Sequence, residues 1–208
     1  MKTYIDLNTY PRRSHFDYFR SLAFPYVGLT ANVDVTNLIR YAKERRGSPF
    51  LAILWAASRA ANSIPELRQR IEGDCIVEYD HCNVGHTVAL PDHTFCNCHT
   101  DCRRPLEDFL VYAKRCQEEA MQHHGFVNPE EDESGLIFTS CVPWVAFTQC
   151  IQPVPIPADC NPRIVFGKFI KDGEKTLMPL HIQCNHALVD GYHIGAFYQE
   201  FEKIAASV

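Results

Sequence analysis

Near its C-terminus the sequence combines a histidine and an aspartate in a pattern that could do acid–base chemistry. His186 and Asp190 form His-x-x-x-Asp-Gly. Apolar periodicity predicts a strand before this pattern, over residues 176–183, and a helix after it, over residues 191–206. A histidine at a strand end, ahead of an Asp-Gly turn, is suited to act as an exposed base on a rigid support. The pattern also fits a buried histidine followed by an aspartate that caps the helix.

The elements that must position this pair are a mixture of strands and helices. Strands are predicted over residues 3–7, 26–35, 75–79, 84–90, 94–99, 135–140, 144–149, 163–170 and 176–183. Helices are predicted over residues 15–22, 37–45, 50–63, 105–123 and 191–206. Asp172-Gly173 predicts a hairpin turn, and three prolines predict an irregular loop over residues 151–161. The expected fold is α/β, more closely an α+β two-layer sandwich in which helices cover a mixed sheet, as one domain over residues 1–208.

Composition narrows the classes of partner. The chain has 208 residues, of which 46% are hydrophobic and 22% charged, so it can bury a full core. Its net charge of −5 argues against nucleic acid as the main partner, because phosphate binding favours a basic face. No run approaches the length of a membrane span and no signal peptide opens the chain, so a soluble, cytoplasmic protein without a membrane partner is expected.

Ten cysteines raise the questions of disulfides and of metal binding. A chain of this length does not need disulfides for stability, and reduced thiols are expected. Cys96, Cys98, His99 and Cys102 resemble a metal site in composition. They contain no Cys-x-x-Cys pair, and no second pair follows at zinc-finger spacing, so no metal is expected. On a strand, Cys96 and Cys98 would share one face, and His99 would lie on the other.

Six separated stretches resemble motifs of the chloramphenicol acetyltransferase family, in its trimeric type A form. They occur in the family's order and span nearly the whole chain, whereas dihydrolipoyl acyltransferase domains of the wider superfamily share only the last motif. The stretches are Arg12-Arg13-Ser14-His15-Phe16, Glu66-Leu67-Arg68, Thr94-Phe95, Ser140-Cys141-Val142-Pro143-Trp144, Gly167-Lys168-Phe169 and the segment from His186 to His193.

The resemblance implies an acetyltransferase. Acetyl-CoA would be the co-substrate, with no bound cofactor, and chloramphenicol would be the expected hydroxyl acceptor. The partners would be these small molecules and two further copies of the chain, in a homotrimer with active sites between subunits. An alcohol is a weak nucleophile, so His186 would act as its general base. Ser140 matches the serine whose hydroxyl stabilises the developing oxyanion; an ordinary strand serine is the alternative.

The resemblance also assigns supporting residues. Asp190 would pair with Arg12, and both would orient the site without carrying a proton. His193 would be structural. The matched acceptor-binding positions are Tyr18, Phe19, Phe95, Phe126, Arg163 and Val165, and the matched CoA-binding positions are Trp144 and Lys168. Core packing or an exposed surface charge explains each of these residues equally well when it is taken alone.

The acceptor positions depart from the family more than the catalytic ones do. Asn185 replaces the first histidine of the family's His-His pair. Arg163 stands where the family has an apolar residue, and Val165 where it often has threonine. A buried arginine needs a partner or solvent. Two alternatives therefore remain: the same chemistry on another hydroxylated small molecule, or a relative that binds a small molecule without acetylating it.

Overall fold

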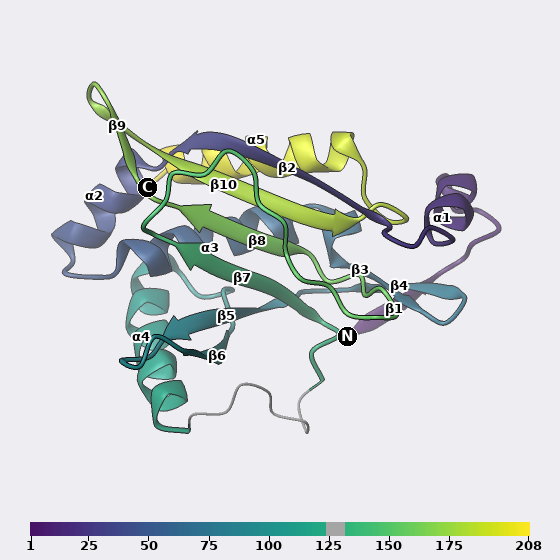
Figure 1. Cartoon of the computed structure of the whole chain (residues 1–208), viewed down its shortest axis with the longest axis horizontal. Coiled ribbons are helices and arrows are strands. Elements are labelled where there is room, and N and C mark those ends of the chain that lie inside the picture. The colour runs from purple at the N-terminus through teal and green to yellow at the C-terminus, as the bar shows by residue number, and fades with distance from the viewer. Residues whose placement is uncertain (124–131) are drawn as a thin grey trace.

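The computed structural model describes residues 1–123 and 132–208 (Figure 1). Strands and helices alternate along the chain largely as the apolar periodicity predicts. The strands are β1 (Lys2–Ile5), β2 (Tyr26–Asp34), β3 (Gln69–Glu72), β4 (Cys75–Tyr79), β5 (Asn83–Ala89), β6 (Phe95–Thr100), β7 (Leu136–Val142), β8 (Arg163–Gly167), β9 (Ile170–Asp172) and β10 (Lys175–Asn185). The helices are α1 (Arg13–Phe19), α2 (Thr36–Glu44), α3 (Pro49–Asn62), the 3-10 turn η1 (Pro65–Arg68), α4 (Leu106–His123) and α5 (Gly191–Ala206).

A large mixed sheet forms the centre of the molecule. Its strand order is β2-β10-β8-β7-β5-β6, and β9 pairs with β10. The pairs β5–β7 and β7–β8 are parallel, and the other pairs are antiparallel. In Figure 1 the helices α3 and α5 lie behind this sheet, while the segment that joins β7 to β8 crosses in front of it. The predicted class, a mixed sheet covered by helices, is confirmed.

The two faces of the large sheet differ in character. The helix face carries Ile164 and Ile182, which are buried in the main hydrophobic core with Phe197 of α5. The other face is here called the open face. In register across it lie Ser140, Val165, His181 and Thr30, on β7, β8, β10 and β2. Residues opposite one another in a sheet point to the same side, so these side chains form one row on the open face.

Local signals explain the best-predicted elements. Helix α5 begins after Asp190, whose carboxylate accepts the N–H of Tyr192 at 3.0 Å, while the imidazole of His193 accepts the N–H of Asp190 at 3.1 Å. This reciprocal cap fixes the start of the helix. Helix α3 begins after Ser48, with Pro49 in its first turn. The turn between β9 and β10 holds Gly173 at a φ of +57°, as the Asp-Gly signal predicts.

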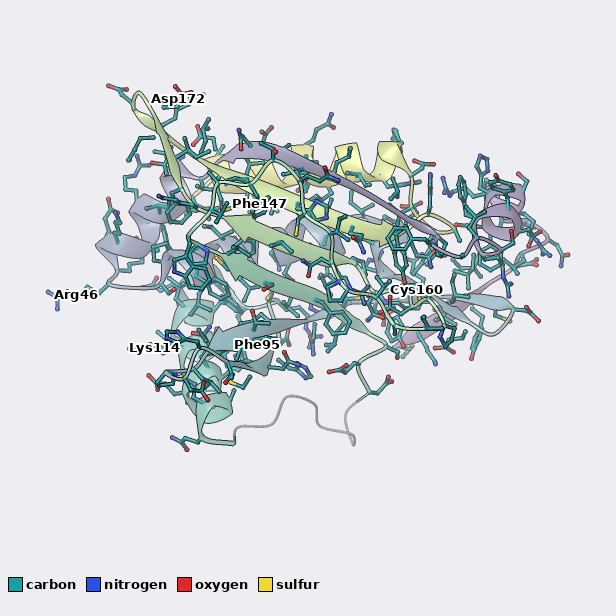
Figure 2. The ribbon with its side chains drawn as sticks, in the orientation of Figure 1. Arg46, Phe95, Lys114, Phe147, Cys160 and Asp172 are labelled. Carbon is teal, nitrogen blue, oxygen red and sulfur yellow. The ribbon has the colours of Figure 1, made fainter. Side chains whose placement is uncertain are left out.

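Two predictions about elements are wrong. Residues 144–149 do not form a strand, because β7 and β8 pair with each other, and this segment instead crosses the open face. Phe147, labelled in Figure 2, packs there against Gly167, where a Cβ atom would lie only 2.9 Å from the Phe147 ring. Strand β3 was not predicted. Its polar sequence carries the buried Arg70, whose guanidinium donates to the carbonyl oxygens of Ser134, Leu136 and Leu67.

Within the described part of the chain, no helix combines the length and the apolar character needed to cross a membrane.

Candidate active site

His186 lies directly after β10, in the turn that leads to α5. Its Nδ1 is 2.8 Å from the carbonyl oxygen of Val189. A carbonyl oxygen only accepts hydrogen bonds, so Nδ1 carries the proton and donates it to this bond. The lone pair of the neutral ring is then on Nε2, the atom that a general base needs. The main-chain N–H of His186 donates to the carbonyl oxygen of Pro25 at 2.7 Å and fixes the turn to the start of β2.

Two aromatic residues of α1 stand beside this histidine. The ring of Phe19 stacks on the imidazole of His186, with centroids 3.8 Å apart and planes 17° from parallel. The ring of Tyr18 meets Phe19 edge-on at 5.1 Å and is largely exposed. Stacking fixes the plane of the imidazole and leaves an aromatic surface next to it. The structure therefore brings three of the predicted site residues together.

Asp190 does not contact Nδ1 of His186, because Val189 occupies that position. Its carboxylate instead forms an ion pair with Arg12, and Arg12 also reaches the main-chain carbonyl of His186 at 3.5 Å. His193 completes the cluster, with Nε2 3.6 Å from a carboxylate oxygen of Glu66. Burial raises the pKa of Asp190, but the hydrogen bond and charge of Arg12, with the hydrogen bond from the main-chain N–H of Tyr192, outweigh it and lower the pKa overall. The carboxylate therefore stays ionised as a structural anchor.

Ser140 lies on the open face in the middle of β7. Its hydroxyl is 3.1 Å from the hydroxyl of Thr87 on β5. If Thr87 donates in this pair, the proton of Ser140 is free for another acceptor, as an oxyanion donor requires. Val165 stands next to Ser140 in register on β8 and is buried.

Ser140 and His186 are far apart within one chain. Ser140 is two strands from His181 on β10, and His186 follows His181 by five residues along the chain. Two strand spacings are about 10 Å and five residues of strand about 16 Å, so the separation is about 19 Å. A general base and an oxyanion donor act on one reacting centre, within about 3 Å of its atoms. These two residues of a single chain cannot do so.

Arg163 is buried on β8, and the structure supplies the partner that a buried arginine needs. Its guanidinium binds both carboxylate oxygens of Asp159, at 2.8 and 2.6 Å. Because Asp159 neutralises this charge, Arg163 does not present a free cation to an acceptor. Phe95, another predicted acceptor residue, is half-exposed at the start of β6. Phe126 lies outside the described residues.

The predicted CoA-binding residues lie together at the end of β7 and β8. Trp144 is exposed. The main-chain N–H of Lys168 donates to the carbonyl oxygen of Val145 at 3.0 Å, which places Lys168 beside Trp144 and leaves its side chain exposed. An exposed indole and an exposed ammonium group suit the stacking and charge of a nucleotide-containing substrate.

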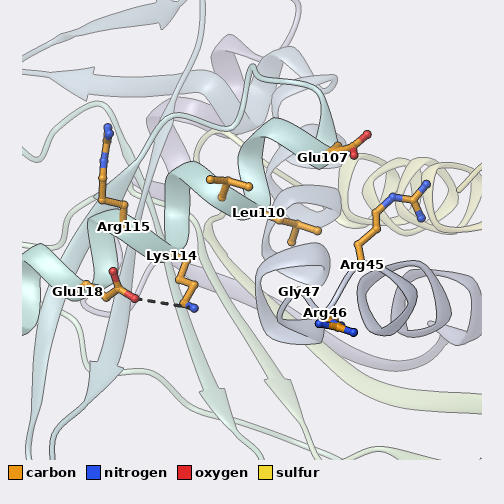
Figure 3. A pocket seen from close by; sticks show the side chains of 9 residues that line it. Arg45, Arg46, Gly47, Glu107, Leu110, Lys114, Arg115 and Glu118 are labelled. Carbon is orange, nitrogen blue, oxygen red and sulfur yellow. Dashed lines mark ion pairs between the residues drawn. The ribbon is translucent and has the colours of Figure 1, made fainter.

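A separate surface pocket of about 540 Å³ lies between the α2–α3 turn and α4 (Figure 3). Some of its charged side chains contact other groups of the protein. Lys114 approaches Glu118 at 3.9 Å, and the guanidinium of Arg45 lies over the ring of Tyr41 at 3.6 Å. The pocket is formed by residues other than the predicted site residues, so we do not include it in the active site.

The cysteines show no metal-site geometry in the described residues. All ten lie in the described part of the chain and are free thiols there. Cys96 and Cys98 are buried on one side of β6, and His99 lies on the other, as the alternation predicts. Across residues 1–123 and 132–208, no group of three or more His, Cys, Asp or Glu side chains is arranged to hold a metal ion.

Comparison with known proteins decides the family. A family model described as chloramphenicol acetyltransferase matches residues 1–202. The chain belongs to the chloramphenicol acetyltransferase family. The resemblance inferred from the six sequence motifs is thereby confirmed, and the protein is an acyltransferase enzyme, as predicted.

Relatives of this family cover nearly the full chain. A chloramphenicol acetyltransferase of Proteus mirabilis is 28% identical over 203 residues, which are 96% of this chain and 92% of the relative. A solved structure of a chloramphenicol acetyltransferase has a TM-score of 0.84 at 25% identity and covers 98% of this chain and 99% of that chain. A probable dihydrolipoamide acetyltransferase from Listeria monocytogenes has a TM-score of 0.70 over 95% of this chain and 92% of that chain, and at 16% identity it shares the fold alone.

Sequence reasoning missed several contacts of the site. Thr87 was placed within a predicted strand but not associated with Ser140. The carbonyl of Val189 has no signature in a sequence, because every residue carries a carbonyl. Asp159 fell in the proline-rich loop, and its partner Arg163 follows it by only four residues. An aspartate close in sequence to an isolated buried arginine is a signal that could have found this pair.

Proposed function

We propose that this protein is a single-domain acetyltransferase that transfers the acetyl group of acetyl-CoA to a hydroxyl group of a small molecule, with chloramphenicol as the first acceptor to test. The observation that carries this proposal is the state of His186. Its Nδ1 is held by the Val189 carbonyl and its plane is held by the Phe19 ring, so that Nε2 is the free basic atom. Family membership supports the reaction class.

The proposed reaction has two proton transfers. Nε2 of His186 takes the proton of the acceptor hydroxyl as its oxygen attacks the thioester carbon. The hydroxyl of Ser140 donates a hydrogen bond to the oxyanion that forms. When the intermediate collapses, the carbon–sulfur bond breaks, and the imidazolium of His186 returns its proton to the thiolate of CoA. Arg12 and Asp190 hold the turn that carries the histidine but transfer no proton.

The site requires two copies of the chain. His186 and Ser140 of one chain are about 19 Å apart by their register in the sheet. We therefore propose a homotrimer in which His186 of one subunit faces Ser140 of the next. Exposed apolar side chains at and just before β2, and on the segment that joins β7 to β8, support contact between copies: Phe24, Leu29, Ile151 and Ile156.

The first test is the release of CoA thiol from acetyl-CoA, measured with and without chloramphenicol. Wild-type protein should release thiol only when chloramphenicol is present. His186→Ala should lower kcat by at least about 10³-fold, because the alcohol loses its base, and should leave the assembly unchanged in size. The matched control is His181→Ala, which removes a histidine of β10 that lies five residues before His186.

The outcomes separate the candidate functions. Equal turnover by His186→Ala and wild type would exclude His186 as the base. Release of CoA thiol with a different hydroxylated compound, but not with chloramphenicol, would support the mechanism and show that the acceptor is another molecule. Tight binding of acetyl-CoA without release, across a panel of hydroxylated compounds, would favour a binding protein that does not acetylate.

A further inference from the structure

The turn that carries His186 is held from both sides, and only one of the two supports was expected from the sequence. On the helix side, Asp190 is anchored by Arg12. On the strand side, the anchor is Asn185, the last residue of β10 and only 3% exposed. Its side-chain Nδ2 donates to the main-chain carbonyl of Asp159 at 2.9 Å, and its Oδ1 accepts the N–H of Ala187 at 3.0 Å.

These two bonds use opposite ends of one carboxamide. Oδ1 and the main-chain carbonyl of Asn185 together close the turn, because the main-chain oxygen accepts the N–H groups of Leu188 and Val189, both at 3.1 Å. The position of Val189 then decides where its own carbonyl points, and that carbonyl holds Nδ1 of His186 at 2.8 Å. The carboxamide of Asn185 thus holds the turn through Ala187, next to the main-chain bond that positions Val189, whose carbonyl sets the tautomer of the base.

The carbonyl that Asn185 binds is itself fixed. The carboxylate of Asp159 accepts hydrogen bonds from both terminal nitrogens of the Arg163 guanidinium, at 2.8 and 2.6 Å. The hydroxyl of Tyr26 reaches the main-chain oxygen and Oδ1 of Asp159, both at 3.0 Å. Tyr26 also stands opposite Asn185 in the β2–β10 register. Asp159 is thus tied to β8, to β2 and to the end of β10.

A cavity adjoins these contacts, which gives the segment around Asp159 room to move if they are lost. It has a volume of about 460 Å³, and Asp159 and Asn185 line it with Pro25, whose carbonyl accepts the N–H of His186. Packing alone does not hold this segment in place, because one side of it faces open space. Hydrogen bonds must therefore supply the precision.

We propose that Asn185 is a positioning residue for His186, and that Asp159, Arg163 and Tyr26 form with it a latch that joins the segment over the open face to the turn of the base. The latch rests on the proposed function only in that His186 is the base. Arg163 belongs to this latch rather than to acceptor recognition.

The test is Asn185→Leu, which keeps the branched shape of the side chain and removes both of its hydrogen bonds. Nitrogen-15 shifts of the His186 imidazole, assigned by comparison with His186→Ala, report its tautomer without any substrate. Wild type should show the Nδ1–H form alone, and Asn185→Leu should show a mixture of both forms. In the thiol-release assay, kcat should fall about 10- to 100-fold, because small misplacement of a catalytic group costs this much, while KM for acetyl-CoA stays within about two-fold.

The matched control is Tyr198→Phe. The Tyr198 hydroxyl also binds strands β2 and β10, through the carbonyls of Leu29 and Leu180 at 2.9 and 2.7 Å, but far along them from His186. Its loss should lower stability without changing the tautomer or kcat. Asn185→Asp serves if Asn185→Leu does not fold. This variant keeps the oxygen that accepts the N–H of Ala187. It loses the donor to the Asp159 carbonyl, because a carboxylate oxygen would face that oxygen instead. We expect it to give mixed tautomers of His186 as well.

A folded Asn185 variant with the wild-type tautomer overturns the proposal, as does one with mixed tautomers and wild-type kcat. Failure of the wild-type enzyme to release thiol with any acceptor would count against the proposed function instead. The tautomer measurement would still decide the positioning role in that case, because it requires no turnover.

Discussion

At the scale of residues, the site separates the group that would move a proton from the groups that hold it. Nδ1 of His186 is bonded to a neutral carbonyl, whereas Asp190 is bonded to Arg12 and to the cap of α5. This arrangement differs from a Ser-His-Asp triad, in which the carboxylate binds the imidazole. An aspartate four residues after the histidine therefore stabilises the turn, and the charge of the imidazolium is not balanced by direct contact with it.

The role of Asp190 predicts a stability effect that depends on pH. Asp190→Asn keeps an acceptor at the N-cap but removes the negative charge that Arg12 binds. Any loss of stability therefore reports the ion pair and not the helix cap. The folded-state pKa of Asp190 is lowered from 3.8, so its contribution is present above that value and is lost as pH falls through the folded-state pKa. Urea unfolding at pH 7 should show Asp190→Asn to be less stable by about 1 kcal/mol, the size of a partly exposed pair.

The difference between wild type and Asp190→Asn should narrow as pH falls below about 4, where the unfolded carboxyl becomes protonated. Asn37→Ala is a suitable control, since the side chain of Asn37 donates a hydrogen bond to the main-chain carbonyl of Ala206 at the end of α5 and carries no charge. A stability difference for Asp190→Asn that stays constant from pH 7 to pH 3 would contradict the assigned ion pair.

At the scale of elements, the sequence was sufficient where the signals were local. Helix α5 follows from a cap and was predicted at the observed residues, and the turn between β9 and β10 was predicted from Asp172-Gly173, although the strand predicted over residues 163–170 ends at Gly167. Strand β3 and residues 144–149 were not, because their structure depends on partners distant in sequence. Arg70 of β3 donates to the carbonyl oxygens of residues 134 and 136. The ring of Phe147 packs against Gly167, where the missing side chain leaves room for it.

The candidate site divides in the same way. His186 was identified from a short motif, whereas the Val189 carbonyl and the Asn185 contacts depend on how the turn closes. The link from Asp159 to Tyr26 could not be predicted, since it requires the segment after residue 150 to fold back across the open face. Local patterns predicted the candidate reacting residues, and the tertiary fold supplied the groups that contact them.

The latch between elements predicts a large coupling between Arg163 and Asp159. Arg163→Met should destabilise the fold by about 2–4 kcal/mol, because it leaves the Asp159 carboxylate without its partner in a mostly buried position. The double variant Arg163→Met with Asp159→Asn also removes the unpaired carboxylate. Its free energy of unfolding should be within about 1 kcal/mol of the wild-type value. Urea unfolding of the four proteins of this double-mutant cycle measures the coupling. Additive effects of the two changes would show that the pair does not act as a unit.

At the scale of the whole molecule, the distance between the reacting groups determines how many chains an active site needs. In one chain the sheet register holds Ser140 and His186 about 19 Å apart, and neither strand can slide without turning its buried face outward. If both residues react, as we propose, each chain would carry two half-sites at different places on its surface. Rotational symmetry of three-fold or higher order brings unlike surfaces of neighbouring copies together, so a ring of identical chains can complete every site.

Mixed assemblies of two inactive variants test this arrangement. Ser140→Ala should lower kcat by about 10²- to 10³-fold through loss of the oxyanion donor, and His186→Ala should lower it further. If the two variants are unfolded together and refolded as random trimers, each site has about one chance in four of receiving His186 from one variant and Ser140 from the other. Thiol release should then rise to about one quarter of the wild-type value.

The same two variants, refolded separately and mixed only afterwards, provide the control, because subunits that do not exchange leave every site with one group missing. Activity restored by joint refolding requires that the base and the oxyanion donor come from different chains. Joint refolding into trimers without any gain in activity would place both groups in one chain. That outcome conflicts with the register of β7, β8 and β10, so it would require the sheet itself to be arranged differently.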